Sequence, residues 1–196
     1  MKKILQKDKK ILRQIAQMVP VQNIKTTKIK KILKEMSQAL KSQDDGVALA
    51  APQIGYSLRI FIVSGRVLQA GFLERGVSQG DGPRGSAARA LADSDPAQGY
   101  PAVKNLVFIN PKISKLSRTK EWMPEGCLSV RPLYGRTFRS KKATIVAYDE
   151  NGKKFTRGAS RLLAQIFQHE TDHLNGILFI DHAKDVKAEI PQNKIK

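Results

Sequence analysis

Two histidines, His169 and His173, stand four residues apart, and Glu170 directly follows the first of them. Residues at this spacing project from the same face of an α-helix, so two imidazoles can reach one metal ion. A carboxylate beside such an ion can exchange protons with a water molecule that the ion activates. The motif therefore predicts a catalytic metal centre. The simpler alternative is a surface helix that happens to carry two of the three histidines in the chain.

A catalytic metal with tetrahedral geometry takes three protein ligands and leaves one position open. Cys127 is the only cysteine, and Gly126 before it lets the backbone approach another element. A lone cysteine is more often a small buried apolar residue than a ligand. Beside a helix that lacks a third ligand, ligation is the better interpretation, because a divalent cation deprotonates a thiol outright. Cys127, His169 and His173 are thus the predicted ligands, and Glu170 the predicted proton carrier.

Hydrolysis of a carbonyl compound also requires donors for the negative charge that develops on the attacked oxygen. Gln53 is the one polar side chain in the small, apolar segment 46–55, and its amide can donate. The backbone N–H of Leu128 can supply a second donor. Spacing alone favours a different role for Gln53, as a buried residue bonded to the backbone of a strand and turn.

Patterns along the chain predict the elements that position these residues. Apolar residues at helical spacing predict a helix that Ser160 caps and that Asn175 and Gly176 end. A second helix, capped by Thr27, buries an apolar stripe and exposes lysines on its other side. Further apolar runs predict strands at 59–63 and at 106–109, the latter ended by Asn110-Pro111, and a β-hairpin over 143–156.

At 196 residues the chain is expected to form a single domain over 1–196, with an atypical Gly/Ala-rich insert at 64–103 and a flexible tail at 184–196. Its formal net charge is +18, and residues 1–41 hold twelve of the Lys and Arg residues. Such a chain is attracted to polyanions, although a lysine-rich surface can also serve solubility alone. The single cysteine excludes an internal disulfide, and no apolar run approaches the ~20 residues that span a bilayer. We therefore expect a cytoplasmic protein without a membrane partner.

Three segments resemble, in order and spacing, the signature motifs of the peptide deformylase family: Gly-Val-Ala-Leu-Ala-Ala-Pro-Gln at 46–53, Glu-Gly-Cys-Leu-Ser at 125–129 and Gln-His-Glu-Thr-Asp-His at 168–173. The resemblance covers 46–181 apart from the insert. It implies an α+β fold, with antiparallel strands packed around a central helix that carries the His-Glu-x-x-His motif. It also implies a hydrolase that removes the N-formyl group from the N-terminal methionine of nascent polypeptides and releases formate.

The same resemblance implies a ferrous ion, Fe²⁺, as the native cofactor, which Zn²⁺, Ni²⁺ or Co²⁺ can replace. It assigns the metal to Cys127, His169 and His173, and general acid–base catalysis to Glu170. Gln53 and the Leu128 N–H would hold the formyl oxygen. The substrate methionine would lie against Gly46, Val47, Met123, Leu162 and Ile166.

The chain departs from the family pattern at Ala48, where glycine is usual, and at Gln165, where the family tends to be apolar. Two alternatives remain. A zinc peptidase would need a downstream third ligand, for which His182 and Glu189 are available. A basic ribosome- or RNA-binding protein would use the fold only as a scaffold. Ribosome binding through residues 1–41 is also compatible with a deformylase, whose substrates emerge there.

Overall fold

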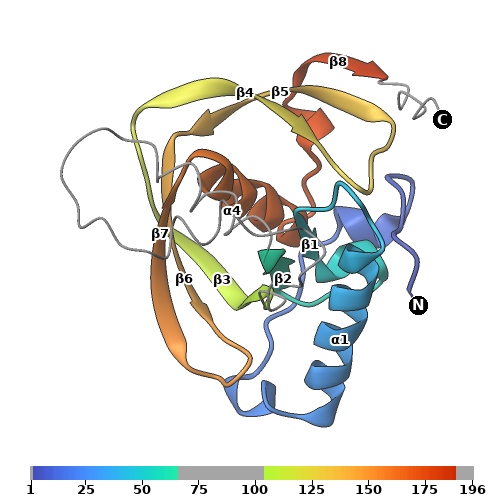
Figure 1. The fold of residues 1–196 in the computed structure, drawn as a ribbon, viewed down its shortest axis with the longest axis vertical. Coiled ribbons are helices and arrows are strands. Elements are labelled where there is room, and N and C mark those ends of the chain that lie inside the picture. Colours follow the sequence, from blue (N-terminus) through green and yellow to red (C-terminus); the bar gives the residue numbers. More distant parts are fainter. Residues whose placement is uncertain (1, 66–103, 189–196) are drawn as a thin grey trace, which may run out of the picture.

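The computed structural model describes residues 2–65 and 104–188. These residues form an α+β structure with two antiparallel sheets and two long helices, which confirms the predicted fold class (Figure 1). The helices and strands are α1 (Thr27–Lys41), β1 (Ala48–Ala50), β2 (Ile60–Val63), β3 (Leu106–Leu116), β4 (Lys120–Gly126), β5 (Leu133–Ser140), β6 (Lys142–Tyr148), β7 (Lys154–Ser160), α4 (Arg161–Leu174) and β8 (Lys184–Ala188).

Helix α4 lies between the two sheets and contacts strands of both (Figure 1). The larger sheet has the strand order β1-β2-β3-β6-β7, and the smaller has the order β4-β5-β8. The predicted hairpin is confirmed as β6 and β7, whose register runs from Lys142 opposite Ser160 to Tyr148 opposite Lys154. Short 3-10 helices fill connections at Lys10–Arg13, Val21–Asn23, Ala51–Ile54 and Phe179–Asp181.

Aromatic packing fixes α4 against the larger sheet. Phe61 on β2 stacks on Phe108 of β3 with 4.5 Å between ring centroids, and Phe167 of α4 meets Phe108 edge-on at 5.2 Å. All three rings are fully buried. Because burying such a side chain contributes about 1.5–3 kcal/mol, this cluster holds the histidine-bearing helix in place.

The apolar stripe predicted for α1 is confirmed. Ile29, Ile32, Met36 and Leu40 are buried against the larger sheet, and Leu33, the fifth predicted member, is partly buried beside them. Lys28 and the other lysines of the helix stay exposed. The predicted cap is displaced by one residue. Thr26 occupies the N-cap position, and its hydroxyl donates to the Asn23 carbonyl instead of capping the helix.

Strand β3 does not end at Asn110-Pro111 as predicted, but continues to Leu116. The strand accommodates these residues by a register shift between Ile109 and Lys112, with Asn110 at a φ of 52°. The Asn110 side chain accepts from the Val19 N–H at 2.8 Å and donates to the Val19 carbonyl at 2.7 Å. These two bonds to a distant segment stabilise a conformation that would otherwise break the strand.

The predicted flexible tail is wrong for its first five residues. Lys184–Ala188 form strand β8, which pairs with β5 through backbone hydrogen bonds that do not depend on apolar side chains. The rest of the tail, and nearly all of the predicted insert at 64–103, lie outside the described residues. Across the described ranges, no helix combines the length and the apolar character that a bilayer crossing requires.

Candidate metal centre

The two histidines of α4 face the same side of the helix one turn apart. Their ring centroids lie 4.8 Å apart, with the rings nearly perpendicular. The helix begins after Ser160 and ends at Leu174, as predicted, although the Ser160 side chain makes no capping hydrogen bond. Gly176 follows at a φ of 75°, and a Cβ there would lie 2.7 Å from the backbone of Arg13. Only glycine fits both conditions, so the stop signal also lets the N-terminal segment pack against the helix end.

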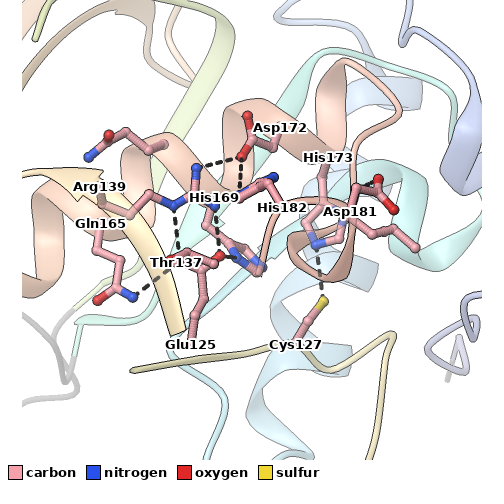
Figure 2. Close-up of polar contacts among 12 residues, drawn as sticks. Glu125, Cys127, Thr137, Arg139, Gln165, His169, Asp172, His173, Asp181 and His182 are labelled. Atoms are coloured by element: carbon pink, nitrogen blue, oxygen red, sulfur yellow. Dashed lines mark hydrogen bonds and ion pairs between the residues drawn. The ribbon is translucent and has the colours of Figure 1, made fainter. Parts of the chain in front are cut away.

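Cys127 reaches the histidines from the end of β4. Its Sγ lies 3.1 Å from His173 Nε2 (Figure 2), and the thiol is buried. The backbone N–H of Ser129 donates to the sulfur at 3.4 Å, and Gln53 Nε2 approaches it at 3.6 Å. These contacts hold the sulfur in a fixed position beside the two histidines.

Gly126 is required for this approach. A Cβ at residue 126 would lie 2.4 Å from the Tyr134 ring on the paired strand β5, which leaves no room for any side chain. The close approach that the sequence suggested is therefore confirmed, and its partner is an aromatic ring.

The three predicted ligands fit a divalent metal ion. One ligand atom from each of Cys127, His169 and His173 lies within 4.8 Å of the others. The thiolate and imidazole donors suit zinc and iron, and a metal at ~2.0–2.3 Å from each would bring them closer together. No other cluster of this kind occurs in the described part of the chain. His182 lies 4.0 Å from Asp172 instead, and Glu189 is outside the described residues.

Glu125 organises the second side of the centre, a role that the sequence reasoning missed. Its carboxylate contacts His169 Nδ1 at 2.7 Å, which leaves His169 Nε2 for the metal (Figure 2). The same carboxylate accepts hydrogen bonds from three further side chains, namely Thr137, Arg139 and Gln165. Burial alone would raise the pKa of Glu125, but the hydrogen bonds from His169 and Arg139 hold that pKa well below its usual value.

Arg139 connects this carboxylate to the metal helix. It donates to Glu125 through Nε and Nη2, and to Asp172 of α4 through Nη1 at 2.6 Å. The Arg139 and Glu125 side chains are almost fully buried, whereas the Asp172 side chain keeps 22% of its surface exposed. The signal for this network was present in the sequence, since Glu125 and Asp172 lie within the two motifs that supply the ligands. Their partner Arg139 stands in neither motif and could not be paired with them from spacing.

Replacing Glu125 with glutamine should therefore lower metal affinity by about 10- to 100-fold, the usual cost of losing a partner that orients a ligating histidine. The substitution keeps the shape of the side chain but removes the negative charge that Arg139 and His169 share. Metal titration with a chromogenic chelator measures the effect. An affinity equal to that of the wild type would show that His169 does not depend on Glu125.

Glu170 is buried beside the predicted metal ligands. Its Oε2 has no hydrogen-bond partner among the described residues, although the atom is inaccessible to solvent. Burial raises the pKa of this carboxyl to about 7, partly offset by the neighbouring His169. A carboxyl group with a pKa near neutrality is suited to both accepting and returning a proton.

Gln53 is held in a fixed orientation opposite the metal helix. Its Oε1 accepts from the Ala50 N–H at 2.7 Å, as the backbone-bonded alternative predicted. Its Nε2 donates to Ser129 Oγ at 3.0 Å and points toward the Cys127 sulfur. The amide group thus presents its donor side to the ligands while its acceptor side is occupied.

A cavity of about 250 Å³ opens onto these groups. Three of the residues predicted to contact substrate, namely Val47, Leu162 and Ile166, line it, as do Gln53, Leu128 and Glu170. Gly46 and Met123 are not part of this lining, and Met123 is buried in β4. The two departures from the expected motif, Ala48 and Gln165, also line the cavity. Gln165 donates to the Pro124 carbonyl at 2.8 Å, so its polar head is bonded to β4.

The fold and a cluster of one thiol and two imidazoles that could hold a metal ion are those of a class of metal-dependent hydrolase. Residues 1–189 match the family model described as polypeptide deformylase. The chain belongs to the peptide deformylase family, and it removes the N-formyl group from nascent polypeptides.

Named relatives agree with this assignment. The peptide deformylase of Borreliella burgdorferi is 35% identical over 81% of this chain and 74% of its own length. The crystal structure of a peptide deformylase from Legionella pneumophila is similar at a TM-score of 0.70 and 29% identity, over 94% of this chain and 87% of that one. A Met-Ala-Ser-bound peptide deformylase from Acinetobacter baumannii has a TM-score of 0.69 and 26% identity, over 91% and 96% of the two chains.

Proposed function

We propose that Cys127, His169 and His173 hold the catalytic ion, that Fe²⁺ is the native ion, and that Zn²⁺, Ni²⁺ or Co²⁺ can replace it. The observation that carries this proposal is the convergence of one thiol and two imidazoles within 4.8 Å. When bound, such an ion polarises a carbonyl oxygen and brings the pKa of water to about 7. A buried thiolate and two imidazoles form a donor set that iron and zinc both accept.

Glu170 carries the proton through the reaction. It takes a proton from the attacking water and returns it to the amine that leaves as the C–N bond of the formamide breaks. Its side chain suits this role because it is buried next to His169 and lines the cavity.

Gln53 and the Leu128 N–H stabilise the negative charge on the formyl oxygen. Both residues line the cavity on the side of Cys127. The Gln53 amide needs little reorganisation, since its hydrogen bonds to Ala50 and Ser129 already fix its plane. Donors that are positioned in advance stabilise developing charge more than donors that must turn.

The methionine side chain of the substrate occupies the apolar part of the cavity. Val47, Leu162 and Ile166 supply this surface. The Acinetobacter relative binds Met-Ala-Ser, a peptide that begins with methionine. Gly46 and Met123 stay among the proposed substrate contacts although they do not line the cavity as it stands. Each directly precedes a residue that does, Val47 and Pro124 respectively.

One purified sample tests this function. We expect divalent metal equimolar with protein, formate release from formyl-methionyl peptides, and higher activity with iron loaded without oxygen than with zinc. Cleavage of internal peptide bonds without formate release would instead indicate a zinc peptidase. An active sample without bound metal would remove the proposed centre.

The enzyme works in the cytoplasm at the ribosome, where its nascent substrates emerge. The exposed lysines of α1 and the basic N-terminal segment provide the surface for this contact. Removing residues 1–25 would not test it, because Leu12, Val19 and Ile24 in this segment are buried in the core.

Reversing charge on α1 is the appropriate test. The double variant Lys28→Glu/Lys31→Glu should bind ribosomes about tenfold more weakly in co-sedimentation, with a shallower salt dependence, because two cations facing phosphate are lost. The variant Lys153→Glu/Lys154→Glu changes net charge equally at the exposed β6–β7 turn and serves as the control. Equal ribosome affinity of both variants and the wild type would exclude α1 from the contact.

A further inference from the structure

The smaller sheet has a second face, directed away from α4. Side chains alternate along a strand, so Thr137 and Arg139 of β5 point inward to the metal network while Phe138 between them points outward. Phe138 stands opposite Trp122 of β4, and cross-strand pairs share one face. The outer face, as defined here, consists of Lys120, Trp122, Pro124, Arg136, Phe138 and Lys184.

Two aromatic rings at the centre of this face are exposed to solvent. Trp122 keeps 37% and Phe138 keeps 50% of its surface accessible, and their ring centroids lie 5.3 Å apart. Large aromatic side chains are usually buried unless a partner covers them. The pair thus provides a flat π surface that the catalytic centre does not use.

Cations surround these rings. Lys184 Nζ lies 5.0 Å from the Trp122 ring centroid, Lys120 Nζ lies 5.9 Å from that of Phe138, and Arg136 pairs with Lys184 across the strands. The outer face as defined includes no carboxylate. Glu121, the next residue along β4, is paired with Lys141 at 2.7 Å.

We propose that the outer face binds single-stranded RNA. Bases stack on Trp122 and Phe138, and the phosphates between them contact Lys120, Arg136 and Lys184. Unpaired bases offer the π surface that an exposed aromatic pair recognises, and an RNA backbone offers the charge that surrounding cations recognise. Stacking a base on an aromatic ring contributes more binding free energy than a lysine placed over the same ring at the surface. The two lysines therefore turn from the rings to the phosphates when RNA binds.

The structure favours RNA over a protein partner. A protein interface of this kind is depleted of lysine at its core, whereas here a lysine lies over each ring. The net charge of +18 adds a long-range attraction for a polyanion. Of the outer-face residues only Pro124 also lines the cavity, so RNA stacked on Trp122 and Phe138 leaves the cavity open for substrate.

The test uses the full, metal-loaded protein and a fluorescein-labelled uridine oligonucleotide, with binding followed by fluorescence anisotropy. Trp122→Leu/Phe138→Leu keeps apolar bulk but removes both π surfaces, and should weaken binding at least about tenfold. Lys120→Glu/Lys184→Glu should weaken it at least as much and reduce its salt dependence. Formate release should be unchanged in both, which also shows that both variants fold.

Lys153→Glu/Lys154→Glu is the matched control, because it changes net charge equally at a distant exposed turn. The proposal requires this control to lose much less affinity than the outer-face charge variant. If both charge variants lost the same RNA affinity and the leucine variant lost none, RNA would be held only by the overall positive charge. That result would overturn the proposed site. Unchanged RNA binding in the leucine variant, together with a lower sedimentation mass, would overturn it in favour of contact between two copies of the chain.

If the double leucine variant does not fold, Phe138→Leu alone replaces it, since Phe138 is the more exposed ring. A duplex oligonucleotide of the same length is the second probe. Its bases are not available for stacking, so it should bind more weakly than the single strand and should not respond to the leucine substitutions.

Discussion

Glu170→Gln should lower the rate of formate release by about 10²–10⁴-fold, the contribution usual for a positioned general acid–base group. The amide keeps the size of the carboxyl group in a fully buried position, so the surrounding packing is retained. It cannot take a proton from water at neutral pH. The KM for a formyl-methionyl peptide should change little, since the glutamine leaves the apolar part of the cavity intact.

Metal content distinguishes this role from a structural one. The variant should bind metal as the wild type does, because Glu170 is not one of the three convergent ligands. Glu121→Gln is the matched control, because it makes the same chemical change at a half-exposed position of β4 that is outside the cluster. If Glu170→Gln lost its metal, the residue would be assigned to the structure of the centre and not to proton transfer.

Cys127→Ser should have the other large effect, on the metal itself. A serine hydroxyl is a much weaker anionic ligand than a thiolate, because a hydroxyl loses its proton far less readily than a thiol. Loss of a ligand should cost more affinity than the ~10- to 100-fold expected for loss of an outer partner such as Glu125. Iron content after gel filtration, measured with formate release on the same sample, reports both consequences.

Cys127→Ala serves as the companion variant, since it removes the ligand without offering a hydroxyl in its place. The two variants should lose metal to a similar degree if the thiolate is the ligand. Unchanged metal content and activity in both would remove Cys127 from the centre. The 3.1 Å contact of its sulfur with His173 Nε2 would then be a hydrogen bond only.

The Glu-Gly-Cys-Leu-Ser segment serves the candidate metal centre in more than one way, because its Glu125 orients His169, a predicted ligand on helix α4. Cys127 is itself a predicted ligand, Gly126 makes room for Tyr134, and Glu125 holds His169. Three consecutive residues of β4 and its end therefore serve the same centre in different ways. Burying charged groups lowers the free energy of unfolding. In this protein the buried charges of Glu125 and Arg139 fix the orientation of His169.

The sequence by itself determined the local geometry. The four-residue spacing of His169 and His173 places both rings on one face of any α-helix, and the apolar pattern of 162–167 makes that helix amphipathic. The β-hairpin of β6 and β7 followed from alternation around a polar turn. Such features depend on neighbours within a few residues, so they can be read without the rest of the chain.

Only the tertiary structure decided which distant groups meet. Arg139 joins Glu125 to Asp172 because β5 pairs with β4 in one particular register, and no local pattern encodes that register. Strand β8 forms because β5 offers a free edge, although its own sequence is polar. Asn110 stays within β3 because Val19 satisfies its side chain from more than ninety residues away. These outcomes depend on contacts between segments that are far apart in the chain, and such contacts leave little trace in local composition.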